Sequence, residues 1–317
     1  MNAESPAPDL RHEIGLGDRA QAAAEQHPAE RPDTASLIRG HTRVGDWDVT
    51  VLTDGFFYLD GGAMFGVIPK PLWEKRSPAD ARNRILLGTN TVVLRDGRQT
   101  IVIETGIGDK LTEKQREIYA AKGLLLSAFA QAAIPLESVD IVLNSHLHFD
   151  HSGWNTRRDP GGLLVATFPR ARYFAQQGEV ADGRLQRERD GVSYMADNYE
   201  PLLATGQMTL LDGPAEITPG IRVELFPGHT PQLQAIHIES HGQHACYISD
   251  LIPTTAHLDL TWGMGYDLDP LRVIAERKRF YARAIAEQWL VLFTHDHHTP
   301  FARLAWNDRA RPILRPE

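Results

Sequence analysis

The sequence has almost no cysteine. Cys246 is the single one among 317 residues, so the chain cannot form an internal disulfide framework. It lies in the run Ala-Cys-Tyr-Ile, which predicts a buried strand, and a free thiol there reads as a small core residue. Folding therefore depends on apolar burial, and a chain of this length with 42% hydrophobic residues can bury a sizeable core.

Long apolar runs and positive charge are also scarce. No segment approaches the roughly 20 apolar residues that a membrane span needs. The first residues show no basic stretch followed by an apolar one, so we expect no signal peptide, no membrane partner and a cytoplasmic location. The formal charge of −8 argues against a nucleic-acid partner, which usually requires a basic face.

The composition changes near residue 40. Residues 1–40 are rich in Ala, Glu, Asp, Arg and Pro and poor in large apolar side chains, so we predict a flexible N-terminal arm. Residues 41–317 show no internal linker and predict one catalytic domain. Helices are expected at about 111–132 and 271–288. Strands are expected at 47–54, 91–94, 100–104, 141–144, 172–174, 208–211, 222–226, 235–239, 244–249 and 289–294. Two strand-rich halves, each closed by helices, indicate an α/β protein built as a β-sandwich with helices on its outer faces.

The main chemical signal follows the predicted strand at 141–144. Residues 145–153 read Ser-His-Leu-His-Phe-Asp-His-Ser-Gly, which places three histidines and one aspartate within six residues. In an extended approach His146 and His148 project to the same side, because side chains alternate with period two. Asp150 and His151 then lie on the following turn. Imidazole and carboxylate are ligands that Zn²⁺, Mn²⁺ or Fe²⁺ accept in catalytic sites, so this segment predicts a metal centre.

The pattern His-x-His-x-Asp-His resembles the signature of the metallo-β-lactamase superfamily, and residues 42 to 305 resemble that family as well. Its members carry another histidine in a Gly-His-Thr-Pro turn, which stands here at His229. They carry a bridging aspartate after an apolar strand, here Asp250, and a last histidine after a late strand, here His295. The resemblance implies a four-layer αββα sandwich. His297 and His298 follow closely, but a strand end favours His295 as the ligand, with the other two as supporting or exposed loop residues.

The resemblance also implies how the ligands divide. His146, His148 and His229 would hold one divalent ion, Asp150, His151 and His295 a second, and Asp250 would lie between the two, with zinc as the first choice of metal. Two such ions sharing a hydroxide provide a nucleophile at neutral pH. Asp150 could also guide a proton to the leaving group. A homodimer is a further implication of the family.

Some positions narrow the subclass by resemblance. Antibiotic-degrading β-lactamases lack the bridging carboxylate that Asp250 provides, and flavodiiron oxidoreductases have glutamate in place of His148. Acyl-homoserine lactonases place a tyrosine shortly after the bridging aspartate, whereas residues 251–254 here read Leu-Ile-Pro-Thr. Tyr266 is a candidate replacement from another loop. The Asp-Leu-Ile run at 250–252 and the helix around 276–280 look more like the branch that contains methyl parathion hydrolase.

Two positions depart from the usual family pattern. Gln232 stands where glycine is common, and Glu104 replaces the aspartate of an Asp-Thr-Gly turn. Glu104 occupies a supporting position, so neither departure removes a metal ligand.

An apolar pocket is predicted from aromatic and methionine residues near the motifs, since small-molecule sites are mostly apolar with a few polar groups. Its candidates are Met64, Phe65, Phe149, Trp154, Trp262, Met264, Tyr266 and Phe301. The predicted function is a dinuclear-metal hydrolase that attacks a lactone or carboxylic ester with a metal-bridging hydroxide. A quorum-quenching type of lactonase fits this description. The alternatives are a phosphotriesterase and a metal-binding module without catalysis.

Overall fold

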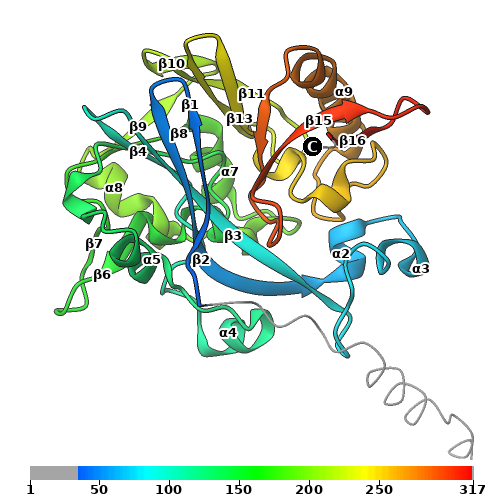
Figure 1. Cartoon of the computed structure of the whole chain (residues 1–317). Coiled ribbons are helices and arrows are strands. Elements are labelled where there is room, and N and C mark those ends of the chain that lie inside the picture. Colours follow the sequence, from blue (N-terminus) through cyan, green and yellow to red (C-terminus); the bar gives the residue numbers. More distant parts are fainter. Residues whose placement is uncertain (1–34, 316–317) are drawn as a thin grey trace, which may run out of the picture.

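The computed structural model describes residues 35–315, and within them two seven-stranded sheets face each other (Figure 1). The first sheet has the order β1-β2-β3-β4-β5-β8-β9, with bounds Ile38–Val44, Trp47–Asp60, Arg84–Arg95, Thr100–Ile103, Ile141–Leu143, Arg172–Gln176 and Met208–Leu211. The second runs from β10 to β16, with bounds Ala215–Thr218, Ile221–Leu225, Gln234–Ser240, Gln243–Tyr247, Leu290–Leu292, Phe301–Trp306 and Pro312–Leu314. A separate two-stranded ribbon joins β6 (Thr156–Arg158) and β7 (Leu164–Ala166).

Side chains alternate between the two faces of each strand, and the two faces pack in different layers. In β3, Val92 and Leu94 pack between the two sheets, while Val93 faces the outer helices of the first sheet. In β4, Ile101 and Ile103 likewise point inward. This is the period-two pattern of a strand buried on both faces. Each sheet therefore needs a helical cover.

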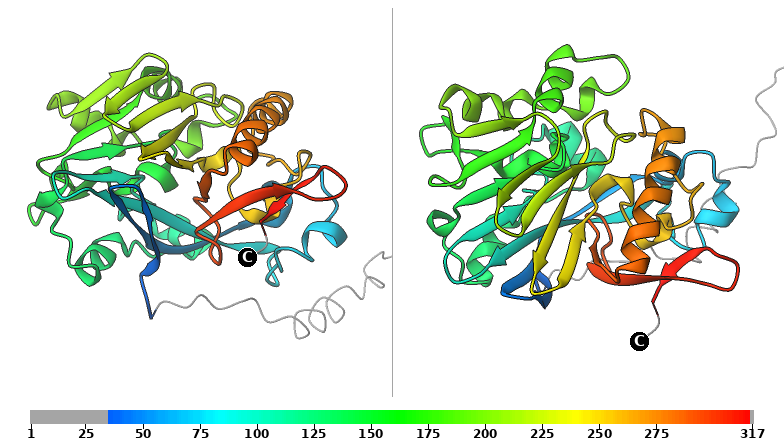
Figure 2. Two further views of the ribbon diagram at one scale, coloured as in Figure 1. Left: turned by 45° about the horizontal axis from the view of Figure 1, so that its top comes forward. Right: turned by 90° about the horizontal axis from the view of Figure 1, so that it is seen from above.

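Helices supply that cover on both outer faces (Figure 2). The first sheet is covered by α5 (Leu125–Gln131), α7 (Gln177–Leu185) and α8 (Glu200–Ala204), whose buried residues share one core with it. The second is covered by α9 (Pro270–Ala286), which packs through Val273, Phe280 and Ala284. The predicted four-layer αββα architecture is confirmed. Short helices complete the chain: α2 (Gly61–Phe65), α3 (Lys70–Trp73), α4 (Glu113–Tyr119) and α6 (Phe149–Ser152).

The predicted single helix at 111–132 is wrong, because α4 and α5 are separate helices. Ala120 has a left-handed φ of 48°, which ends α4. Gly123 then passes so close to the backbone that an added Cβ would lie 2.4 Å from the carbonyl oxygen of Gly108. Tertiary packing at this glycine breaks a segment whose apolar pattern alone favours one helix.

The N-terminal boundary also differs from the prediction. Residues 1–34 of the predicted arm lie outside the described residues. Strand β1 begins at Ile38 and pairs with β2 in antiparallel fashion, so the last residues assigned to the arm belong to the sheet. Leu37 is already buried in the core that α5 shares with the first sheet.

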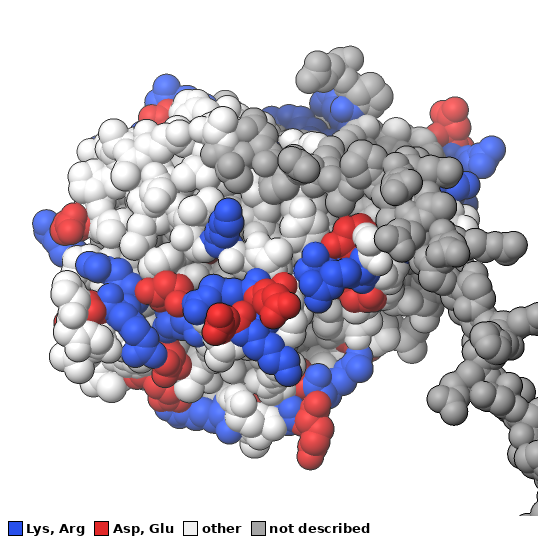
Figure 3. All heavy atoms as spheres, turned by 90° about the horizontal axis from the view of Figure 1, so that it is seen from below, with Lys and Arg blue, Asp and Glu red and all other residues white. Residues whose placement is uncertain are grey.

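Surface charges in the described structure are mixed. The face seen from below carries Lys and Arg interleaved with Asp and Glu rather than a continuous basic area (Figure 3). Among residues 35–315 no helix combines the length and apolar character that a bilayer crossing demands.

Candidate metal centre and substrate pocket

Parallel strand pairs bring the motifs to one edge of the sandwich. β4 and β5 are parallel, so Glu104 after the first and the 145–151 segment after the second leave at the same edge. β13 and β14 are also parallel, with Tyr247 paired to Leu292. Asp250 and His295 each lie three residues beyond those partners. The carboxyl ends of parallel strands are a common place for functional residues.

Three histidines form the first cluster. His146, His148 and His229 are buried, and each offers a ring nitrogen within 4.8 Å of the nitrogens of the other two. Nε2 of His229 lies 3.2 Å from Nδ1 of His148. Nε2 of His146 is buried without a hydrogen-bond partner. Buried imidazole nitrogens that converge and stay unpaired fit a divalent metal ion.

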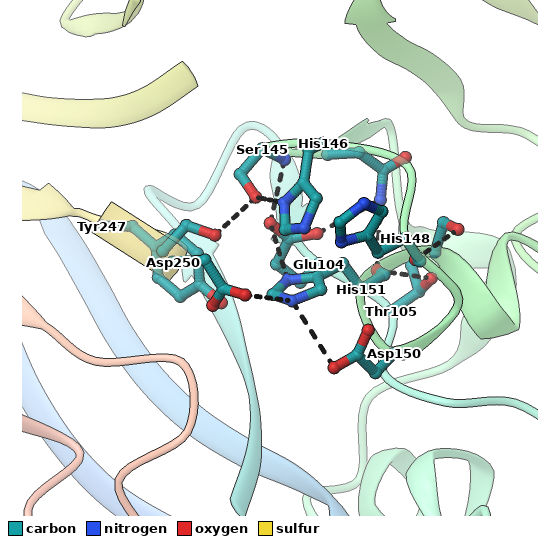
Figure 4. Close-up of polar contacts among 12 residues, drawn as sticks. Glu104, Thr105, Ser145, His146, His148, Asp150, His151, Tyr247 and Asp250 are labelled. Atoms are coloured by element: carbon teal, nitrogen blue, oxygen red, sulfur yellow. Dashed lines mark hydrogen bonds and ion pairs between the residues drawn. The ribbon is translucent and has the colours of Figure 1, made fainter. Parts of the chain in front are cut away.

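Asp150, His151 and His295 form the second cluster, again with ligand atoms within 4.8 Å of one another. Asp250 lies between the clusters. Its Oδ2 is 3.3 Å from Nε2 of His229 and 3.5 Å from Nε2 of His151, and its Oδ1 is 3.3 Å from Nε2 of His295. Figure 4 shows Asp250 and Asp150 on either side of the His151 ring. The structure thus brings all seven predicted ligand residues together.

Three of the histidines, His146, His229 and His295, are oriented through Nδ1. Nδ1 of His146 lies 2.9 Å from Oγ of Ser145, and Nδ1 of His295 lies 2.8 Å from the carbonyl oxygen of Gly88. Nδ1 of His229 lies 3.1 Å from Oδ1 of Asp267. Such partners fix the ring and leave Nε2 to face the centre, which is the usual support for a metal-binding histidine.

Glu104 has the supporting position expected from the sequence. Its Oε1 accepts a 2.9 Å hydrogen bond from the backbone N–H of Ser145 and lies 3.7 Å from Nδ1 of His151. Its backbone φ of 61° is left-handed, so the turn holds an uncommon conformation to aim this carboxylate. Gln232, the other departure, accepts a 2.9 Å hydrogen bond from the backbone N–H of Gly178 through Oε1.

The electrostatics of the centre keep His146 and His148 neutral and Asp250 ionised. Burial and the neighbouring histidines hold the pKa values of His146 and His148 well below 6.5. Burial opposes protonation of His151 as well, but the carboxylates of Asp250 and Asp150 outweigh it and raise the pKa well above 6.5. Burial would raise the pKa of Asp250, yet His151 and the other nearby imidazoles lower it far below 3.8. An ionised carboxylate among convergent imidazoles is the environment that a divalent cation requires.

A pocket opens above this centre. Four of the predicted pocket residues line it: Met64, Phe149, Met264 and Tyr266. His148, Asp150, Asp250 and His295 lie in the same lining, so a molecule in the pocket would reach both clusters.

The other four predicted pocket residues have structural roles instead. Phe65 stacks on Trp73 and His257, with centroid distances of 5.3 and 4.6 Å. Trp262 packs edge-on against Phe65, and the Arg76 guanidinium lies 3.6 Å from its ring centroid.

Trp154 and Phe301 also lie away from the pocket. Trp154 is buried and donates from Nε1 to Oδ1 of Asp54 at 2.7 Å. Phe301 lies on β15 against the inter-sheet core. These side chains satisfy core packing or a buried hydrogen bond, which is the more frequent role of an aromatic residue.

Sequence reasoning missed several residues at the site. Tyr119, Arg189, Asp190 and Ser193 line the pocket from segments without a recognisable motif. Glu179 is a buried carboxylate that accepts hydrogen bonds from three groups: the backbone N–H of Leu147 at 3.1 Å, Oγ1 of Thr230 at 2.5 Å and the Tyr194 hydroxyl at 3.2 Å. Burial raises its pKa to about 7 despite these bonds. Glu179 ties the 145–151 segment to the turn that carries His229.

The histidines at 295, 297 and 298 differ in burial. His295 is buried and faces Asp150 and Asp250, while His298 is exposed and His297 is half-buried. The rings of His297 and His298 lie 4.1 Å apart, on the loop beyond the strand end.

Comparison with known proteins gives one family match, to the metallo-beta-lactamase superfamily over residues 84–295. A crystal structure of a probable metal-dependent hydrolase from Staphylococcus aureus is similar at a TM-score of 0.78 and 31% identity, and the match covers 87% of this chain and 99% of that one. An N-acyl homoserine lactonase from Bacillus thuringiensis is 24% identical over 196 residues, which are 61% of this chain and 67% of the relative.

A third relative shares the fold. The structure of a dizinc quorum-quenching lactonase, in complex with a product, has a TM-score of 0.72 at 20% identity and covers 89% of this chain and 98% of its own.

Proposed function

Since the chain belongs to the metallo-β-lactamase superfamily, as its His-x-His-x-Asp-His motif predicts, we propose that this hydrolase binds two divalent metal ions and opens a lactone or carboxylic ester. The observation that carries the proposal is the pair of clusters joined through Asp250 at the base of a pocket. Zinc is the expected metal, because imidazole and carboxylate suit it and a lactonase of the same fold is a dizinc protein.

The ligand set fits two ions. His146, His148 and His229 would hold one, Asp150, His151 and His295 the other, and Asp250 has an oxygen toward each cluster. When bound, the ions supply Lewis acidity and lower the pKa of water at the site. The surrounding residues fix the ligands, most of which are buried, and burial strengthens the electrostatic contribution to catalysis.

Pocket residues provide the remaining chemistry. In ester or lactone hydrolysis, water adds to the carbonyl carbon, the acyl–oxygen bond breaks, and the leaving oxygen takes a proton. Asp150 lines the pocket, and we assign it the transfer of that proton. Tyr266 also lines the pocket, and burial together with Tyr119 raises its pKa to about 12. Its phenol therefore stays a hydrogen-bond donor at neutral pH, suited to the developing oxyanion.

Similarity supports the lactone class. The Bacillus thuringiensis relative is an N-acyl homoserine lactonase, and the pocket wall of Leu59, Met64, Phe149 and Met264 is apolar enough for an acyl chain. A neutral substrate with a short acyl chain is thus the first to test.

The test is kcat/KM on one zinc-loaded preparation, with N-hexanoyl homoserine lactone and an aryl dialkyl phosphate as substrates. We expect the lactone to be preferred by a hundredfold or more, about 2.7 kcal/mol of transition-state discrimination. A preference for the phosphate would replace the lactonase by a phosphotriesterase.

The control is His148→Ala, which should remove hydrolysis of both substrates. If the loaded wild type shows no turnover across ester, lactone and phosphate panels, the proposal fails and a metal-binding module without catalysis takes its place.

A further inference from the structure

A second group of potential metal ligands lies away from the pocket, where β12 meets β13. His237 and Glu239 are two residues apart on β12, so their side chains share one face of the sheet. Glu239 pairs directly with His244 of β13 in the antiparallel ladder. The three side chains therefore lie on the face that α9 covers, as the neighbouring core residue Cys246 also does.

Their ligand atoms are as close as those of a metal site. Nδ1 of His237 lies 2.9 Å from Nε2 of His244, which lies 3.6 Å from Oε1 of Glu239. Each of the three residues offers one ligand atom within 4.8 Å of those of the other two. Two ligands of a tetrahedral zinc, each about 2.0 to 2.1 Å from the ion, are roughly 3.3 Å apart. The two short distances bracket that value, so small side-chain shifts would complete the geometry.

His237 is already oriented for metal binding. It is fully buried, and its Nε2 lies 3.2 Å from Oε2 of Glu224. Glu224 is held in turn by Arg283, whose Nη1 donates at 2.7 Å, and by Arg279. A carboxylate on one imidazole nitrogen fixes the tautomer that leaves the other nitrogen with its lone pair. In this arrangement the lone pair of Nδ1 points to His244, whose Nε2 shares a hydrogen bond with it at 2.9 Å, and an ion would bind between the two nitrogens in place of the shared proton.

The site is open to solvent on one side. A hollow lined by Glu239, His244, Glu287 and Trp289 reaches it from the surface. The side chain of Glu239 is 44% exposed and that of His244 13% exposed, so an ion can enter and keep water as a further ligand. Arg222 pairs with Glu239 at 2.8 Å, which opposes a cation and makes a weaker site than the centre at Asp250.

We propose that His237, Glu239 and His244 form a third divalent transition-metal site, which takes Zn²⁺ with water as its fourth ligand. His244 stands six positions before Asp250 in the chain, so the two lie at most about 22 Å apart. An ion held there cross-links β12 and β13 and stabilises the folded state, because it binds that state preferentially. The inference does not depend on the proposed hydrolytic function.

The test counts zinc equivalents on the full chain by competition with a chromophoric chelator. We expect the wild type to bind one equivalent more than His244→Ala, with the extra equivalent the weakest. His241→Ala is the matched control: His241 lies on the turn between the same strands, at the edge of the same hollow, but its imidazole pairs with Asp46 and contributes no ligand to the cluster. It should bind as many equivalents as the wild type. Lactone hydrolysis by the loaded enzyme should be equal in all three proteins.

A second variant tests the same site with less risk of misfolding than His244→Ala. Glu239→Gln keeps the shape of an exposed side chain, and we expect it to weaken the third equivalent about tenfold or more while the tighter equivalents are unchanged. Equal zinc stoichiometry in the wild type and His244→Ala, or a third equivalent unaffected by Glu239→Gln, would overturn the site. The test compares the number of zinc equivalents bound by the wild type and by the variants. It can therefore be interpreted even if the hydrolase proposal fails.

Discussion

Asp267 lies against the predicted metal ligand His229, with 3.1 Å between its Oδ1 and the ligand's Nδ1. The other oxygen of the same carboxylate accepts a 2.8 Å hydrogen bond from the backbone N–H of Met264, a residue of the pocket wall. One side chain therefore sets both the orientation of a predicted metal ligand and the position of the loop that brings Met264 to the pocket wall.

Asp267→Asn should disturb both the orientation of His229 and the loop that carries Met264. An amide in place of the carboxylate holds the imidazole less firmly, so we expect zinc affinity or kcat to fall about 10- to 100-fold. Asp269→Asn is the control, because Asp269 accepts from the backbone N–H of Arg272 at the start of α9 and asparagine serves equally well there. Zinc content and steady-state kinetics measure the effect. Equal loss in both variants would show that the position matters only for folding.

The choice among the late histidines is testable by a pair of variants. His295→Ala removes a buried side chain that faces Asp150 and Asp250, so we expect loss of one bound zinc and at least a hundredfold fall in kcat/KM, since the ligand holds the reacting centre. His298→Ala changes an exposed side chain and should leave metal content and turnover near wild type. The reverse pattern would assign the ligand to His298.

Tyr266 offers a test of oxyanion stabilisation. Tyr266→Phe removes one hydrogen-bond donor and keeps the ring, so kcat should fall about 10²-fold with little change in KM. Tyr119→Phe is the matched comparison, because Tyr119 lines the same pocket and its ring stacks on Phe149 at 5.3 Å. We expect a smaller effect there. A larger loss in Tyr119→Phe would move the assignment to that phenol.

The low pKa of Glu224 predicts that this residue contributes to the loss of stability in acid. Burial alone would raise the pKa of its carboxyl, but hydrogen bonds from His237, Arg283 and Arg279 lower it well below 4.5. As the pH falls below about 4.5, the unfolded chain takes up a proton at this residue before the folded chain does, so the free energy of unfolding decreases. Urea unfolding between pH 3.5 and 6, with chelator present, should show a shallower decrease for Glu224→Gln than for the wild type. Parallel curves for the two proteins would contradict this assignment.

Much of the fold and metal centre could be predicted because the information is local. His146, His148, Asp150 and His151 follow one short strand, so their spacing alone brings them together. His229, Asp250 and His295 each occupy a strand end or turn with its own motif, and the parallel pairing of β13 and β14 places the last two side by side. Two strand-rich halves, each closed by helices, predicted a β-sandwich with outer helices, and the family resemblance implied its four layers.

The pocket was less predictable because its residues share no pattern. Phe65 and Trp154 are aromatic residues near a motif, as Phe149 is. However, Phe65 stacks on Trp73 and Trp154 donates to Asp54, and these contacts hold both side chains in the core. The interruption of the predicted helix between α4 and α5 depends on the close approach of Gly123 to Gly108. Such outcomes depend on which segments meet in space.

The sequence by itself determined the family, since its motifs depend on short-range spacing, and the resemblance to that family implied the αββα architecture and the candidate metal ligands. Only the tertiary structure decided which aromatic side chains line the pocket and which of His295, His297 and His298 points inward. It also brought the carboxylate of Glu179 to the backbone N–H of Leu147, 32 residues away, and that of Asp267 to the ring of His229, 38 residues away. The physical reason is that burial and hydrogen bonding act between atoms in space, and residues distant in sequence meet only once the sheets have packed.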